Sequence, residues 1–214
     1  MNNKEFNLKW STNNTKVAKL GAISFGIPAF EAADGFKTCP GAGACAAVCY
    51  ARQGHYVRGA VSSAREHNLK IARTDLKDFE AKAIEDLNRI NNKIVRLHDS
   101  GDFFSQDYYD CWNRIAKQFP DKIFYAYTKS LHLELWRDKA KNFKITQSEG
   151  GKLDHEINKK KPHARIFATD YSRRKAKYGD GHNTDTLAIR GAKKIGLIYH
   201  GNKNLTPAQK VYFS

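Results

Sequence analysis

Three cysteines lie close together in the segment Thr38-Cys39-Pro-Gly-Ala-Gly-Ala-Cys45-Ala-Ala-Val-Cys49-Tyr50-Ala51. The spacing is Cys-x5-Cys-x3-Cys, and the glycines and alanines between the cysteines are typical of a loop rather than a packed element. Thiolates are soft ligands that suit zinc and iron–sulfur centres. Three thiols without an evident fourth ligand predict a centre with one open coordination position, as in catalytic or sensing sites, whereas structural zinc sites are closed by four protein ligands.

Two further residues are candidates for a fourth zinc ligand. Cys111 falls on the apolar stripe of a predicted helix, which favours a position in the core, and His55 lies six residues past Cys49 and stays open as a ligand. The pattern favours a [4Fe–4S] cluster on Cys39, Cys45 and Cys49, with Zn as the alternative. Disulfides are disfavoured because the N-terminus lacks the apolar stretch of a signal peptide, and clustered cysteines in a reducing compartment more often bind metal.

The length and composition bound the domain organisation. The 214 residues are 41% apolar and 12% aromatic, which predicts one folded α/β domain over 1–214. Within it we expect an N-terminal extension over 1–21, a barrel core over 22–200 and a C-terminal tail over 201–214. No apolar run approaches the ~18 residues that span a membrane, so no membrane partner is expected.

The net charge points to an anionic partner. Lysine and arginine total 37 against 22 acids, a formal charge of +15. Basic clusters gather in the last third of the chain, at Lys159-Lys160-Lys161, Arg173-Arg174-Lys175 and Lys193-Lys194. This distribution predicts a nucleic acid or nucleotide partner, and the alternative is a solvated basic surface without a specific ligand.

Strand-like and helix-like segments alternate along the chain. Short β-branched and aromatic runs predict strands at 22–27, 93–97, 123–127, 143–146, 164–168 and 195–199. Apolar residues at helical spacing predict helices at 60–73, 75–91, 106–119, 131–140 and 152–161, while 171–193 gives no clear pattern. The alternation predicts βαβ units with parallel strands, arranged as a partial (βα)6 TIM-like barrel or as an open doubly wound sheet.

Polar clusters follow each of the six predicted strands. They are the cysteine loop, His98-Asp99-Ser100-Gly101-Asp102, Thr128-Lys129-Ser130, Gln147-Ser148-Glu149-Gly150-Gly151, Thr169-Asp170-Tyr171-Ser172-Arg173 and His200-Gly201-Asn202-Lys203. Because the carboxyl ends of parallel strands lie on one edge of a sheet, we expect these clusters to build one site.

The cluster after the second strand has the most specific pattern. Gly101 allows a ligand to approach the backbone closely, and the neighbouring Ser100 and Asp102 suit a hydroxyl and a cationic amino group. The alternative is a strand-to-helix turn in which Ser105 or Asp107 caps the following helix.

For two other residues that follow predicted strands, the sequence favours neither a binding role nor the absence of one. Lys129 suits a carboxylate or a phosphate, but it would be equally ordinary as a solvated lysine. His200 is open in the same way.

Taken together, these segments resemble the phage gene product 88 family. The resemblance rests on Asn7-Leu-Lys-Trp-Ser11, Ile23-Ser-Phe-Gly-Ile-Pro-Ala29, Cys39-Pro-Gly-Ala, Cys49-Tyr-Ala, His98-Asp-Ser-Gly-Asp-Phe-Phe-Ser105, Tyr125-Ala-Tyr-Thr-Lys-Ser130 and Ile195-Gly-Leu-Ile-Tyr-His-Gly201. It implies a virus-encoded protein that acts in the cytoplasm of the infected host cell.

The order of elements is also similar to that of radical S-adenosylmethionine (SAM) enzymes. That resemblance implies a partial (βα)6 barrel, a [4Fe–4S] cluster on the three loop cysteines and SAM chelating the open iron, with Ser100-Gly101-Asp102 at the position of the amino-binding motif. The cofactor-binding residues would then be Tyr50, His98, Ser100, Gly101, Asp102, Thr128, Lys129, Gln147 and Ser148, and the substrate-binding residues Asp170, Arg173, His200 and Lys203. Radical SAM loops usually have the spacing Cys-x3-Cys-x2-Cys, with an aromatic residue before the third cysteine rather than after it as here.

Three functional hypotheses follow. The first is a radical SAM-like enzyme that acts on a nucleotide or nucleic acid and receives electrons from an electron donor. The second is a non-catalytic phage factor that carries zinc or a cluster and binds nucleic acid, in host takeover or anti-defence. The third is a fold that uses zinc only as a staple, which a core of this size does not require.

Overall fold

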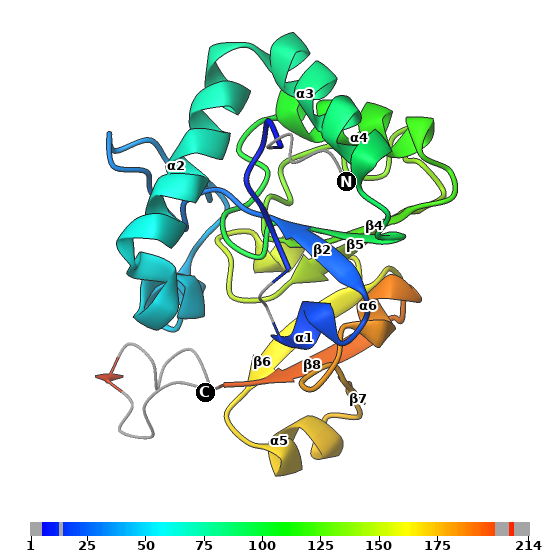
Figure 1. The fold of residues 1–214 in the computed structure, drawn as a ribbon. Coiled ribbons are helices and arrows are strands. Elements are labelled where there is room, and N and C mark those ends of the chain that lie inside the picture. The colour runs from blue at the N-terminus through cyan, green and yellow to red at the C-terminus, as the bar shows by residue number, and fades with distance from the viewer. Residues whose placement is uncertain (1–5, 13–14, 200–205, 208–214) are drawn as a thin grey trace.

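The computed structural model describes residues 6–12, 15–199 and 206–207 and shows a mixed α/β fold around an eight-stranded sheet (Figure 1). The strands are β1 Trp10–Ser11, β2 Ala22–Phe25, β3 Ile94–Leu97, β4 Ile123–Thr128, β5 Phe143–Ser148, β6 His163–Phe167, β7 Gly179–Asp180 and β8 Lys194–Ile198. Their order is β1-β2-β3-β4-β5-β6-β8-β7, and every pair is parallel except β1 with β2. The six predicted strands are therefore confirmed as parallel neighbours in chain order, whereas β1 and β7 were not predicted.

Six α-helices flank this sheet in the described residues. They are α1 Thr15–Ala18, α2 Gly59–Thr74, α3 Leu76–Arg89, α4 Gln106–Gln118, α5 Asp170–Lys175 and α6 Thr186–Ile189, with short 3-10 helices at Ala44–Ala47, Tyr50–Arg52, Gly54–Val57 and Asp154–Glu156. In Figure 1, α2, α3 and α4 lie together above the sheet, and α1, α5 and α6 lie below them. Ser105 caps α4 by accepting the Tyr108 N–H at 3.2 Å, as the capping alternative predicted.

The alternation of side chains along β4 separates two packed layers. Phe124 and Ala126 belong to the large core that β2–β5 share with α2, α3 and α4. Tyr125 points to the other face, into a smaller cluster with α6. Successive residues of a strand face opposite sides, so this strand contributes to both layers.

The helix predicted at 131–140 is wrong, and the segment forms a series of turns instead. Side chains of α4 form hydrogen bonds with the backbone groups of this segment. Gln106 accepts the Glu134 N–H, the Tyr109 hydroxyl donates to the Leu135 carbonyl, and Asn113 bonds the backbone of both Asp138 and Ala140. These tertiary hydrogen bonds replace the ladder of a helix.

The helix predicted at 152–161 is also wrong, except for the 3-10 turn Asp154–Glu156. The Asp154 carboxylate accepts the N–H groups of Gly150 and Gly151 at 2.7 and 2.8 Å. The Gln147 side chain bonds both the N–H and the carbonyl of Asn158. These polar side chains hold the segment as a folded loop, which helical periodicity does not reveal.

The register of the sheet offsets its second half from its first. β5 pairs with β6 through Gln147↔His163 and Ser148↔Ala164, so β6 begins level with the end of β5. β8 begins at the same level, because Lys194 pairs with His163. β6 and β8 therefore extend beyond the carboxyl ends of β2–β5 and form a wall above that edge.

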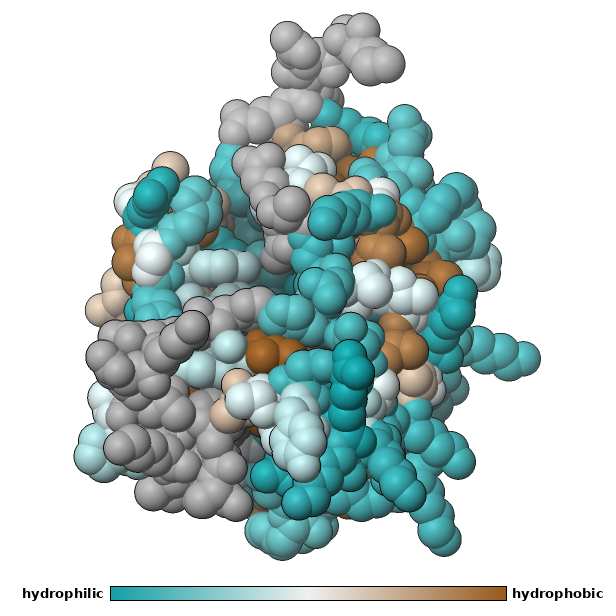
Figure 2. Space-filling view, turned by 90° about the horizontal axis from the view of Figure 1, so that it is seen from below, coloured by the Kyte–Doolittle hydropathy of each residue, from teal (hydrophilic) through white to brown (hydrophobic). Residues whose placement is uncertain are grey.

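Nothing in the fold tests the expected division of the chain into an N-terminal extension, a barrel core and a C-terminal tail. Most of 201–214 lies outside the described residues. Within the described part of the chain, no helix combines the length and apolar character needed to cross a membrane. Hydrophilic side chains dominate the face seen in Figure 2, with only scattered apolar patches.

Candidate metal and cofactor site

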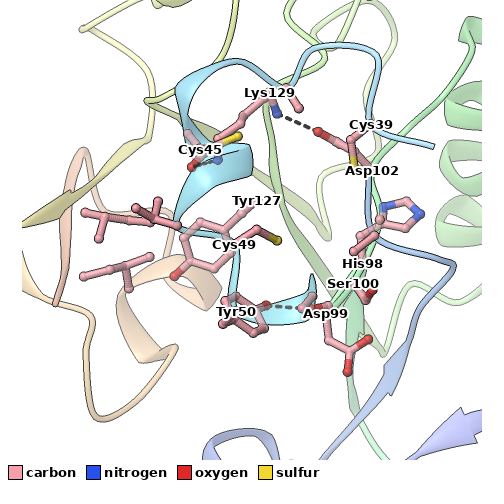
Figure 3. A pocket seen from close by; sticks show the side chains of 18 of the residues that line it. Cys39, Cys45, Cys49, Tyr50, His98, Asp99, Ser100, Asp102, Tyr127 and Lys129 are labelled. Carbon is pink, nitrogen blue, oxygen red and sulfur yellow. Dashed lines mark hydrogen bonds between the residues drawn. The ribbon is translucent and has the colours of Figure 1, made fainter. Parts of the chain in front are cut away.

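A cavity of about 460 Å³ lies where the cysteine loop covers the carboxyl edge of the sheet. All three loop cysteines line it, and Figure 3 shows their side chains around the same space. Other predicted residues that line it are Tyr50, His98, Ser100, Gly101, Asp102, Lys129 and Ser148. Its volume is within the range of small-molecule sites.

The cysteine loop is held down by the loops that follow β4 and β5. The Cys45 N–H donates to the Gly150 carbonyl at 2.9 Å, and Ala42 forms a bridge with Gly151. Gly41 lies so close to Lys129 that an added Cβ would meet the Lys129 carbonyl oxygen at 2.0 Å. A glycine is therefore required at this contact between the cysteine loop and the loop that follows β4.

Asp102 connects three of the loops at this edge. Its carboxylate accepts the Thr128 hydroxyl at 2.6 Å and the Lys129 N–H at 2.8 Å, and its own N–H donates to the Thr38 carbonyl at 3.2 Å. Burial raises the pKa of Asp102, and the hydrogen bonds from Thr128, Lys129 and Phe103 act in the opposite direction. The carboxylate oxygens thus already accept hydrogen bonds from the protein. The cationic amino group of a ligand, which the sequence predicts at Asp102, would have to share these oxygens.

Ser100 is the open polar group of the same motif. The residue is 4% exposed and lines the cavity, and its Oγ has no hydrogen-bond partner. Gly101 next to it has φ +83, and an added Cβ would meet Ile27 Cγ1 at 2.3 Å. The turn therefore needs glycine, and it leaves a buried hydroxyl that a ligand can satisfy.

The sulfur of Cys39 lies among hydrogen-bond donors. The Phe30 N–H lies 3.2 Å from it and the Thr38 hydroxyl 4.0 Å. Burial nevertheless raises the pKa of Cys39 to about 12, with a further contribution from the Asp102 carboxylate. The thiol is therefore neutral unless a cation takes the place of its proton.

Cys49 combines burial with several groups that favour its thiolate. Burial raises its pKa, whereas the backbone N–H groups of Ala51 and Arg52 and the Lys129 ammonium lower it. The Lys129 Nζ itself donates to Ser148 Oγ at 2.7 Å. N–H groups directed at cysteine sulfurs are a normal feature of iron–sulfur ligands.

The three thiols share the cavity without forming a single-ion site. In the described part of the chain, no three His, Cys, Asp or Glu side chains come close enough together to hold one metal ion. A zinc ion needs its sulfur ligands about 2.3 Å from one point. A cubane cluster binds each cysteine through a different iron, so its ligands need not converge on one point.

The floor of the cavity contains a charged network that the sequence did not reveal. Asp185, fully buried just before α6, pairs with Lys16 at 2.7 Å and with Arg96 of β3 at 3.1 Å. The hydroxyls of Tyr125 and Tyr127 donate to the same carboxylate at 3.0 and 3.3 Å. Burial alone would raise the pKa of Asp185, but the charges of Arg96 and Lys16 outweigh it and lower the pKa.

Tyr50 joins this floor to the cysteine loop. Its hydroxyl donates to the Asp99 carbonyl at 2.6 Å and accepts from Arg96 at 3.3 Å, while 47% of the residue is exposed. The Asp99 carboxylate in turn accepts both of its bonds from Arg65 of α2. The residue after Cys49 is therefore anchored to β3.

Several predicted site residues do not line the cavity. Thr128 and Gln147 are buried and bond Asp102 and the Asn158 backbone, respectively. Arg173 is buried on α5, where it bonds Asp170 and the Tyr178 carbonyl. The predictions for His200 and Lys203 lie outside the described residues.

The two candidate fourth ligands do not reach the cavity either. Cys111 is fully buried in the main core, with its sulfur 3.9 Å from the Leu76 carbonyl oxygen, and this confirms its expected core position. His55 is exposed in the 3-10 helix Gly54–Val57.

The fold and the site define an α/β protein with a thiol-lined cavity at the carboxyl edge of a mostly parallel sheet. The chain belongs to the gene product 88 family, whose model matches residues 2–208. It is 38% identical over 131 residues to the gene 88 protein of Mycobacterium phage L5 and 37% identical over 131 residues to that of Mycobacterium phage D29. Each alignment covers 55% of this chain and 54% of the relative, so the chain spans about half the length of these curated relatives. No solved structure matches this chain.

The close contact at Gly41 predicts that a larger residue there destabilises the fold. Gly41→Ala would force the cysteine loop away from the Lys129 carbonyl, and we expect it to lower the free energy of unfolding by about 1–3 kcal/mol. Gly59→Ala is the matched control, because an added Cβ there meets nothing within 4 Å. Urea unfolding of both variants measures the difference, and equal stabilities would contradict the docking of this loop.

His98 predicts a pH dependence of stability. Burial lowers its pKa to about 3, so the unfolded chain binds a proton at pH 5 that the folded chain does not. Stability therefore falls as the pH drops below the unfolded pKa of about 6.5, by about 2 kcal/mol between pH 7 and pH 5 from this group alone. In urea titrations at pH 7 and pH 5, His98→Gln should reduce the difference in the free energy of unfolding by this amount. An unchanged difference between pH 7 and pH 5 would show that His98 titrates normally.

Proposed function

We propose that this phage protein is an iron–sulfur protein with radical SAM-like activity on a nucleotide or nucleic acid substrate. The observation that carries the proposal is that Cys39, Cys45 and Cys49 line one cavity at the carboxyl edge of six parallel strands in chain order. A [4Fe–4S] cluster held by these thiols would supply electron transfer to SAM bound beside it.

The chain's own residues support the holding of such a group. Phe30 and Thr38 direct donors at the Cys39 sulfur, and the backbone after Cys49 does the same there. These donors, and the Lys129 charge near Cys49, partly offset the burial that raises the pKa of Cys39 and Cys49, and so they assist the thiolate forms that a metal centre requires. Zinc remains the alternative metal, and it would require the loop to close around one point.

The motif after β3 supports a division of roles. Asp102 positions the loops, because its carboxylate already accepts from Thr128, Lys129 and Phe103. Ser100 Oγ is buried and unpartnered, so it is the group available to a polar part of the cofactor. Lys129, next to Ser148, offers a cation to a carboxylate of the same ligand.

The far side of the cavity suits the organic part of a ligand. Ile166, Leu197 and Ile198 supply an apolar part of the cavity lining from β6 and β8. Tyr127 adds an aromatic face, and the buried Arg96 closes the floor. Most small-molecule sites combine such apolar walls with a few fixed polar groups.

The biological setting follows from the family. A phage protein of this kind would act in the cytoplasm of the infected cell, and as an enzyme it would draw electrons from a donor protein. The excess of basic residues supports a nucleic acid or nucleotide as the substrate.

Removal of one loop thiol tests the cluster assignment. Cys45→Ala should abolish the broad absorption near ~400 nm after anaerobic reconstitution while the protein stays folded by circular dichroism. Cys111→Ala is the control, since Cys111 lies in the core away from the cavity, and it should keep the absorption. A Cys45→Ala chain that simply unfolds would instead support a structural metal.

Calorimetric titration of SAM into the reconstituted protein tests the second half of the proposal. We expect binding that Ser100→Ala weakens by about 5- to 10-fold, because the variant removes one buried hydrogen bond. An intact cluster that does not bind SAM would exclude the radical SAM assignment and favour the non-catalytic nucleic-acid-binding factor.

A further inference from the structure

Tyr171 is the most exposed large hydrophobic residue in the described part of the chain, with 75% of its surface accessible. It lies in the first turn of α5, directly after the strand β6 that extends past the cavity. A capping box between Thr169 and Ser172 fixes this turn. An aromatic ring held outward on a defined turn is available for stacking against a planar partner.

Two cations share the helix face of Tyr171. Arg174 and Lys175 lie three and four residues further along α5, and residues at these spacings are neighbours on a helix surface. Both are exposed, Arg174 with 75% of its side chain accessible. The ring is therefore flanked by positive charge on its own helix.

The basic surface continues from α5 to the sheet. Lys177 follows the helix and is exposed, and Lys194 of β8 lies with its Nζ 5.7 Å from the ring centre of Tyr178. Tyr178 packs on Phe167 of β6 at 5.2 Å between ring centres. We call Tyr171, Arg174, Lys175, Lys177 and Lys194 the α5 surface.

The α5 surface is fixed firmly to the rest of the fold. The buried Arg173 bonds Asp170 and the Tyr178 carbonyl, and its side chain packs against Gly196 of β8. Asp170 also pairs with Arg174 at 2.6 Å. Even with this acid, the turn from Asp170 to Lys177 carries one acid against four bases.

The net positive charge of the chain is concentrated in the last third of the sequence, which includes α5. Residues 150–214 contain 14 lysines and arginines against five acids, whereas residues 1–149 contain 23 against 17. A basic surface that includes an exposed aromatic ring fits a partner with regularly spaced phosphates and accessible base faces. Duplexes keep their bases stacked inside, so they cannot offer those faces.

From these observations we infer that the α5 surface docks single-stranded nucleic acid, with a base stacked on Tyr171 and phosphates at Arg174 and Lys175. This deepens the proposed function, on which it rests for the class of substrate, by making that substrate a strand rather than a free nucleotide. The extension of β6 and β8 links this surface to the wall of the cavity, so a docked strand would lie beside the proposed reaction site.

Fluorescence anisotropy with labelled single strands of about 12 nucleotides tests the inference. The wild-type chain should bind DNA or RNA strands more tightly than the matching duplex, and a mononucleotide should not compete. Tyr171→Ala should weaken binding roughly 5- to 150-fold, whereas Tyr171→Phe keeps a ring and should bind as the wild type does.

A charge variant separates specific docking from general attraction. Lys175→Gln should lower the slope of log affinity against log salt by about 0.7. Lys77→Gln, an exposed position on α3 with the same loss of charge, should leave the slope unchanged. Equal binding by Tyr171→Ala and the wild type, or preference for duplex, would overturn the inference.

The same samples distinguish failure of this inference from failure of the proposed function. Binding is measured on both metal-free and reconstituted protein, and the absorption spectrum of each variant reports its cluster. A colourless wild-type chain that binds strands through Tyr171 would support the α5 surface while removing the cluster assignment. A brown Tyr171→Ala chain that binds strands as tightly as the wild type would support the cluster assignment and overturn the role of the α5 surface.

Discussion

The hydrogen bonds of Asp102 are the interactions on which the site depends. Its bonds to Thr128 and Lys129, and the bond of its own N–H to Thr38, join the loops that follow β2, β3 and β4. Hydrogen bonds to a buried carboxylate are costly to leave unmade, so these three loops hold one another in place. The cysteine loop is then clamped from above by Gly150 and Gly151, which Asp154 orients.

This framework explains how a flexible glycine-rich loop can present three thiols to one space. Contacts at Gly41 and Gly43 bring its backbone against Lys129 and Gly151, closer than any side chain would allow. Tyr50 fixes the far end of the loop to β3 through Asp99 and Arg96. The sulfurs are thus positioned by main-chain contacts, while the cavity between them stays open to a cofactor.

The parallel order of six strands followed from the alternation of strand and helix patterns, and four of the six clusters after those strands contain residues that line the cavity. Two helices were wrongly predicted because Asn113 and Gln147 satisfy backbone groups that a helix would otherwise pair. The charged floor was missed because Asp185 and Lys16 lie 169 residues apart and meet only in the folded chain. Arg173 looked like a substrate ligand, but its burial under α5 is a tertiary feature that sequence spacing cannot show.

The proposed iron–sulfur centre depends on what the three thiols hold. Counting iron, acid-labile sulfide and zinc in anaerobically purified wild-type protein is the decisive measurement. A [4Fe–4S] cluster on these thiols should give about four irons and a matching amount of sulfide per chain. One zinc per chain, without iron or sulfide, would contradict it.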